Sequence, residues 1–261
     1  MRQENVYENF IGGSFNLPML DHPDALWQTG VMTNEAIHVS QIESKPVHIN
    51  FPFREPLYDT INKSIVNTRK ITHLKVNKSL DSNHLKELQN IWKNSSKKMI
   101  ICGTLEKSDQ LNKLLSDLNN NDSLCILNES TSNLHNENFI CCIDRTLERV
   151  YGETEFIPEL AITIGNSIIS KKLKQLLRKN KPSHHWHIED TNRAQDIFSS
   201  ITHFIPLKPI EFFSQFIENI SFENKSNFGK MWEKEFHLSE KFHRHFLKSC
   251  DWSDLKAHDV I

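Results

Sequence analysis

Apolar residues along the chain alternate between short uninterrupted runs and stretches with helical spacing. Residues 160–164, LAITI, are continuously apolar or β-branched, which is typical of a strand covered on both faces. Gly165 ends this run. Leucines then recur at helical spacing within residues 171–179, and Ser170 precedes them as a potential cap. The pattern predicts a strand, a turn and a helix, and ligands of open α/β sheets bind at such carboxyl edges.

The same alternation extends through the central part of the chain. Further strands are expected at 98–103, 123–127, 184–188 and 202–205, with one more near 139–142 that the pattern does not place firmly. Helices are expected at 82–94, 109–118 and 143–151. This order predicts an α/β fold, Rossmann-like and doubly wound, with a mainly parallel sheet of about six strands and helices on both faces. Such a fold does not by itself imply a bound nucleotide.

The two ends of the chain differ from this central pattern. Residues 1 to about 45 start irregularly, and a helix capped by Thr33 then leads into a strand at 47–51. This is the end of an α/β unit without the other strands it needs. Helices rich in phenylalanine are expected at 210–217 and 227–248. Any part of their aromatic surface that stays exposed favours association.

These patterns divide the chain into four parts. Residues 1–58 contain the end of a first domain, and the polar stretch 59–81 is expected to be a linker. Residues 82–208 are expected to form a central Rossmann-like domain, and 209–261 a helical segment.

Composition excludes several classes of partner. The 31 basic and 33 acidic side chains leave a formal net charge of −2, so nothing in the overall balance indicates a nucleic-acid partner. Apolar runs stay shorter than the roughly 20 residues of a membrane span. The first ten residues lack the apolar core of a secretory signal, so a cytoplasmic location is expected.

Candidate chemistry among cysteine, histidine and glycine is limited. The five cysteines form no CxxC pair, so buried reduced thiols are expected rather than a metal or redox site. In HHWH, strand alternation puts His185 and His187 on one face and His184 and Trp186 on the other, and a zinc site there lacks further ligands. With seven glycines and neither GxGxxG nor GxxxxGK[ST], the two common phosphate-binding loops are absent.

One segment resembles a known family. Residues 46–58, PVHINFPFREPLY, closely resemble the segment that ends the first domain of 2-succinyl-5-enolpyruvyl-6-hydroxy-3-cyclohexene-1-carboxylate synthases (MenD). Arg2 and Gln3 are similar to the last two letters of the family motif ANQxIRQ. The resemblance implies the end of a pyrimidine-binding domain, a whole central domain and the lead-in to a diphosphate-binding domain.

The resemblance also implies an activity for the intact enzyme. That enzyme of menaquinone biosynthesis decarboxylates 2-oxoglutarate on thiamine diphosphate with Mg²⁺ and adds the product to isochorismate, and a homo-oligomer is expected. The family holds the cofactor with a glutamate that would precede Arg2 and with a GDG-type motif that the sequence lacks. We therefore expect no catalytic, cofactor-binding or metal-binding residues in this chain, and no independent catalysis.

Lys171 and Lys172 match a basic pair that faces substrate carboxylates in this family. Ammonium groups at a helix N-terminus add to the attraction of the helix dipole for carboxylates. The alternative is an ordinary solvated first turn of an amphipathic helix. Two other functions remain open: a stand-alone carboxylate-binding or regulatory module, and a nicotinamide-dependent oxidoreductase, against which the missing GxGxxG counts.

Overall fold

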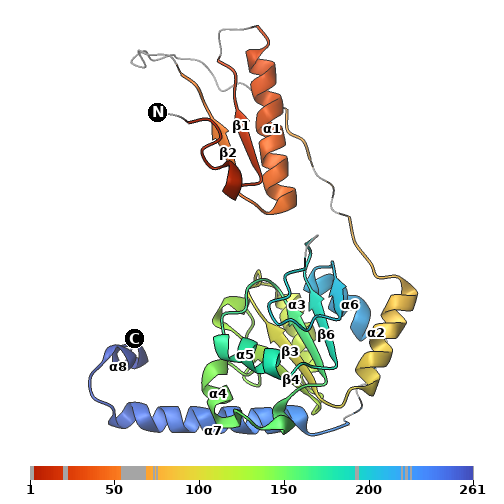
Figure 1. Ribbon diagram of the computed structural model, residues 1–261, viewed down its shortest axis with the longest axis vertical. Coiled ribbons are helices and arrows are strands. Elements are labelled where there is room, and N and C mark those ends of the chain that lie inside the picture. The colour runs from red at the N-terminus through yellow and green to blue at the C-terminus, as the bar shows by residue number, and fades with distance from the viewer. Residues whose placement is uncertain are drawn as a thin grey trace. The chain divides into compact units, whose positions relative to one another are not determined.

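The computed structural model describes residues 3–19, 23–53, 69–72, 74, 76–191, 194–218, 220, 223 and 225–260. The chain forms two compact units, Met1–Val76 and Asn77–Ile261 (Figure 1). Most of the linker expected at 59–81 lies outside the described residues, as do Arg2 and the end of the PFREPLY segment.

The first unit is a small α/β unit. It contains the 3₁₀ helix η1 (Glu8–Phe10), strand β1 (Gly13–Asn16), helix α1 (Ala25–Glu43) and strand β2 (Val47–Asn50). The two strands are parallel, and α1 packs against both. The expected strand after Lys45 is therefore present, whereas β1 was not predicted.

Helix α1 also begins earlier than predicted, at Ala25 rather than after Thr33. Its apolar side chains occur all around its circumference, and Trp27 and Ile37 are exposed. Such a helix has no apolar stripe, so its first turns carry no periodic signal.

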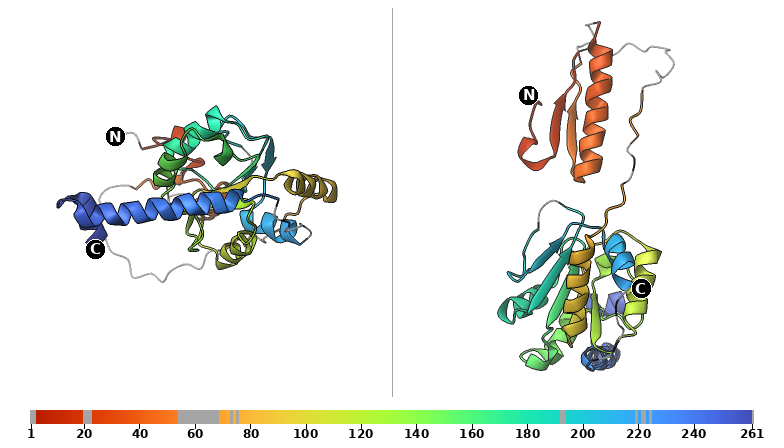
Figure 2. Two further views of the ribbon diagram at one scale, coloured as in Figure 1. Left: turned by 90° about the horizontal axis from the view of Figure 1, so that it is seen from below. Right: turned by 90° about the vertical axis from the view of Figure 1, so that its right-hand side faces the viewer.

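The second unit contains a five-stranded parallel sheet. Its strands lie side by side in the order β4-β3-β5-β6-β7 (Figure 2). The bounds are β3 (Lys98–Cys102), β4 (Leu124–Asn128), β5 (Leu160–Ile164), β6 (His184–Ile188) and β7 (His203–Ile205). The predicted fold class is confirmed. β3, β4 and β5 are buried along their whole length, as expected for strands covered on both faces.

The strand expected near 139–142 is reduced to one bridge. Ile140 lies beside Leu127, and its N–H donates to the carbonyl of Ile126 at 2.8 Å. Cys142 then takes a left-handed conformation with φ of 50°, and a helix starts at the next residue. The turn leaves no room for more pairing, so the sheet has five strands rather than about six.

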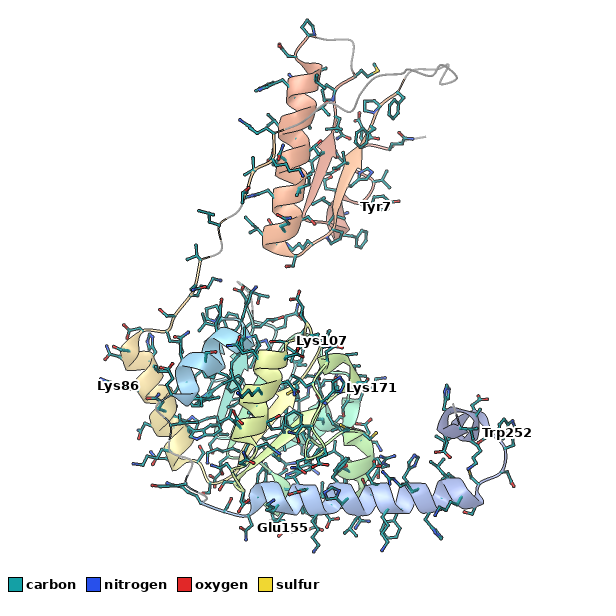
Figure 3. The ribbon with its side chains drawn as sticks, turned by 180° about the vertical axis from the view of Figure 1, so that it is seen from behind. Tyr7, Lys86, Lys107, Glu155, Lys171 and Trp252 are labelled. Atoms are coloured by element: carbon teal, nitrogen blue, oxygen red, sulfur yellow. The ribbon has the colours of Figure 1, made fainter. Side chains whose placement is uncertain are left out.

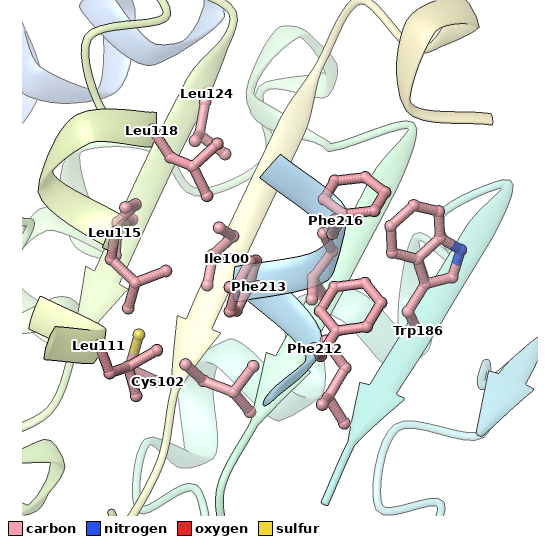
Figure 4. Packing of buried hydrophobic residues seen from close by; sticks show 14 of the residues in the cluster. Ile100, Cys102, Leu111, Leu115, Leu118, Leu124, Trp186, Phe212, Phe213 and Phe216 are labelled. Atoms are coloured by element: carbon pink, nitrogen blue, oxygen red, sulfur yellow. The ribbon is translucent and has the colours of Figure 1, made fainter. Parts of the chain in front are cut away.

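Helices cover both faces of this sheet. One face packs against α2 (Ser82–Asn94), α3 (Asp109–Leu118) and α6 (Pro209–Ile217), and Figure 4 shows Phe212 and Phe216 beside Trp186 there. The other packs against α4 (Ile143–Val150), α5 (Lys171–Lys179) and α7 (Phe228–Ser249). The remaining elements are η2 (Ser130–Ser132), η3 (Thr154–Phe156) and α8 (Asp254–Val260).

The C-terminal aromatic residues divide into buried and exposed sets. Phe212, Phe213 and Phe216 of α6 are fully buried. In the second half of α7, by contrast, Phe242 and Phe246 are more than half exposed. Packing onto the central sheet therefore accounts for α6 and the start of α7. None of the described helices is long and apolar enough to cross a membrane.

Candidate functional site

The carboxyl edge of the sheet is where a ligand was expected, at the point where the chain reverses its winding between β3 and β5. Here the two following loops are joined by backbone hydrogen bonds. Thr104 N–H donates to the carbonyl of Ser167 at 3.3 Å, and Asn166 N–H donates to that of Thr104 at 3.0 Å. A Cβ atom added to Gly103 would lie 2.3 Å from the Asn166 carbonyl oxygen. Backbone therefore fills the space between these loops.

The loop after β4, residues 128–134, closes the same edge. Ser132 Oγ donates to the carbonyl of Cys102 at 2.7 Å, and Asn133 Nδ2 donates to that of Leu105 at 2.7 Å. Ser130–Ser132 form one 3₁₀ turn, followed by Asn133 in the left-handed region. This turn fixes the loop after β3.

Lys171 and Lys172 form the first turn of α5, as predicted. Ser170 caps this helix and accepts from Leu173 N–H at 3.0 Å. Lys171 is exposed at the surface (Figure 3), whereas Lys172 forms an ion pair with Glu148 of α4. Exposed ion pairs contribute about 0–1 kcal/mol, so this pair opens easily.

Sequence reasoning missed Glu129, which also lies at this turn. Both of its carboxylate oxygens accept from Ile169 N–H at 2.8 Å, and Oε1 also accepts from Ser170 N–H at 2.8 Å. The residue is 9% exposed. A carboxylate directly after a buried strand was the available signal, because strand ends of a parallel sheet meet at one edge.

Two further contacts complete the turn. Ser170 Oγ donates to the carboxylate of Asp144, and Lys174 Nζ donates to the carbonyl of Ile168 at 3.0 Å. Three lysines and three carboxylates thus surround the start of α5. Lys171 presents an exposed ammonium group at this turn, whereas the backbone amides of Ile169 and Ser170 already have Glu129 as an acceptor.

Histidines on β6 follow the predicted alternation. His185 and His187 lie on one face, where both contact Thr163, whereas Trp186 packs into the core of the opposite face. Burial lowers the pKa of His185 to about 4, with Asp196 opposing the shift. Its ring nitrogens bond to Thr163 and Ser200, which satisfies it as a neutral core residue.

The cysteines agree only partly with the expectation of buried thiols. Cys102 and Cys125 are buried, and burial raises the pKa of both thiols. Cys142, however, is exposed, because its left-handed conformation at the start of α4 turns it away from the core. That position departs from the prediction. Its neighbour Cys141 is half-buried.

In the described ranges, no group of three or more histidine, cysteine, aspartate or glutamate side chains is placed to hold a metal ion. Gly103 and Gly165 face backbone at close range rather than open space.

Two hollows in the described surface lie along α7. The larger, of about 910 Å³, runs along the outer half of α7 beside Glu137, Phe236 and Arg244. A smaller one is lined by Arg145 and Arg149 of α4 and by Phe242 and Phe246 of α7. Neither includes Lys171 or Lys172.

Comparison with known proteins identifies relatives along the entire chain, although no family model matches. The chain is 34% identical over 263 residues to the 2-succinyl-5-enolpyruvyl-6-hydroxy-3-cyclohexene-1-carboxylate synthase of Flavobacterium psychrophilum, and the match covers 100% of this chain and 46% of the relative. The synthases of Flavobacterium johnsoniae and Porphyromonas gingivalis are 33% and 31% identical, each over 100% of this chain and 47% of their own length. The chain is homologous to part of these synthases. It spans about half the length of the curated relatives it matches.

Proposed function

We propose that this chain corresponds to the central part of a 2-succinyl-5-enolpyruvyl-6-hydroxy-3-cyclohexene-1-carboxylate synthase, acting in the cytoplasm within a homo-oligomeric enzyme. The observation that carries the proposal is homology along the whole chain at 31–34% identity to three such synthases. In this assignment, thiamine diphosphate and Mg²⁺ are bound by other parts of the enzyme. The chain alone does not decarboxylate 2-oxoglutarate.

Within that enzyme, Lys171 and Lys172 bind carboxylates of the substrates 2-oxoglutarate and isochorismate. The exposed ammonium of Lys171 and the weak ion pair of Lys172 support this role. Both lysines stand at the start of the helix that follows the buried strand β5. Lysine here offers a point charge rather than the bidentate fork of arginine.

A chimera tests the proposal. The full chain replaces the matching 263 residues of the Flavobacterium psychrophilum synthase. We expect measurable synthase activity, and we expect Lys171→Ala with Lys172→Ala to raise KM for the anionic substrates by about tenfold or more, as for loss of a charged contact. Lys86→Ala is the matched control, because Lys86 is an exposed lysine on α2 at the other face of the sheet (Figure 3).

The outcomes separate this proposal from a stand-alone module. A folded chimera without activity counts against the central-domain assignment. An unchanged KM in the double variant counts against the role of the lysines. A stand-alone carboxylate-binding module instead predicts that the isolated chain binds carboxylates tightly without the rest of a synthase.

A further inference from the structure

Glu129 occupies the position that an external carboxylate would take at the start of α5. Its carboxylate accepts from the backbone N–H groups of Ile169 and Ser170, in three contacts of 2.8 Å each. These amides directly precede Lys171 and Lys172. A ligand carboxylate that binds the two ammonium groups would also accept hydrogen bonds from these amides, because backbone N–H groups and positive charges at a helix start bind the same anion together.

The Glu129 side chain is held in this position by its own loop. Ser132 N–H donates to the Glu129 carbonyl at 3.0 Å, and Ser132 Oγ donates to the Cys102 carbonyl at 2.7 Å. The loop after β4 is therefore anchored to the end of β3. This anchoring keeps the largely buried carboxylate against the first turn of α5.

The surrounding carboxylates also oppose the binding of an external anion. Glu148 pairs with Lys172, and Asp144 accepts from Ser170 Oγ. The Glu148 side chain is 62% exposed and separates readily from Lys172, whereas Glu129 is largely buried. With these three carboxylates opposite Lys171, Lys172 and Lys174, an approaching anion meets little net positive charge.

We infer that Glu129 is an internal competitor for carboxylate ligands at the start of α5, so that a ligand engages Lys171 and Lys172 fully only when the Glu129 carboxylate has left the amides of Ile169 and Ser170. The inference rests on the proposed role of the two lysines. It deepens that role, because only molecules in which Glu129 has left the amides bind the ligand fully. The apparent affinity is therefore the intrinsic affinity multiplied by the fraction of such molecules. The ligand class is a small dicarboxylate.

The test compares Glu129→Gln with the unchanged full chain. Glutamine keeps the size and one acceptor oxygen, but it removes the charge and the second acceptor. Succinate is titrated against both proteins, with succinamide as the uncharged control. Calorimetry gives the affinity, and the amide NMR signals of Ile169 and Ser170 report where succinate binds. We expect succinate to bind Glu129→Gln at least about tenfold more tightly, with no response to succinamide.

Glu137→Gln is the matched control, because Glu137 is exposed on the same connection between β4 and α4. It removes the same charge and should leave the affinity unchanged. Lys171→Ala with Lys172→Ala in the Glu129→Gln background should abolish the gain. If Glu129→Gln does not fold, Glu129→Asp withdraws the carboxylate by one methylene and should also tighten binding.

Equal affinity of the unchanged chain and of Glu129→Gln for succinate at this turn would overturn the inference and leave the lysine site standing. Weaker binding by Glu129→Gln would overturn it too, since Glu129 would then only support the loop. Absence of any response at Ile169, Ser170 and the two lysines in both proteins would refute the lysine site together with the inference.

Discussion

At the residue scale, Thr163 joins two histidine rings on one face of β5. Its Oγ1 lies 3.1 Å from His185 Nε2 and 2.8 Å from His187 Nδ1, and Glu189 Oε2 lies 3.2 Å from His187 Nε2. An ionised carboxylate only accepts, so His187 Nε2 donates to Glu189. His185 Nδ1 lies 2.8 Å from Ser200 Oγ.

Acid should weaken the fold through His185. Burial lowers its pKa from 6.5 to about 4, so between these values the unfolded chain binds more protons than the folded one. The stability that His185 contributes is fully present above pH 6.5 and is lost as the pH falls toward 4. A shift of this size corresponds to about 3 kcal/mol. Urea denaturation from pH 7 to 4.5 measures the slope.

A substitution isolates the histidine in this experiment. His185→Gln should flatten the slope, whereas His184→Gln, on the opposite face of β6, should not. An equally steep slope in His185→Gln would show that other groups cause the acid sensitivity.

At the scale of elements, α7 lies unusually close to the start of β4. Gly229 N–H donates to the carbonyl of Asp122 at 2.7 Å, and a Cβ atom at Gly229 would lie 2.0 Å from the Leu124 carbonyl oxygen. These are backbone atoms, so they cannot rotate away as a side chain does. The first turn of α7 therefore depends on glycine.

Gly229→Ala should consequently lower the free energy of unfolding of the second unit by about 2–3 kcal/mol, as in an overpacked core. Gly30→Ala is the matched control in α1, because a Cβ atom there meets nothing within 4 Å. Alanine favours a helix by up to about 1 kcal/mol over glycine, so that variant should not be destabilised. Thermal melts followed by circular dichroism compare the two. A Gly229→Ala protein as stable as the unchanged chain would contradict the close packing.

The predictability of each element follows from its burial. α3 and α5 each pack one leucine face on the sheet, so the helical spacing of their leucines located both. α1 is apolar on several sides and was predicted only in its second half. β1, GSFN, has a single large apolar residue and gave no strand signal.

At the scale of the whole molecule, the two units differ in the core they bury. In the described part of the first unit, the buried apolar side chains are Leu17, Ala25 and Ala36. The second unit buries two large clusters, one on each face of its sheet. A two-stranded sheet with so small a core is marginally stable in water.

We therefore expect uneven protection from hydrogen exchange in the isolated chain. Amides of β2 should exchange at least about a hundredfold faster than those of β5, because local opening of a small core costs less free energy. Exchange followed by mass spectrometry resolves the two segments. Comparable protection of β2 and β5 would mean that the first unit has a stabilising contact that its own core does not explain.

The sequence by itself determined the alternation of buried strands and amphipathic helices, because burial on a sheet face imposes a periodicity that local residues carry. It also placed Lys171 and Lys172 on the first turn of α5, next to their cap. Only the tertiary structure decided what surrounds that turn. Glu129 reaches it from the end of another strand, and three loops fill the edge where a ligand was expected. Such contacts join residues distant in the chain, and no local pattern encodes which carboxylate will meet which amide.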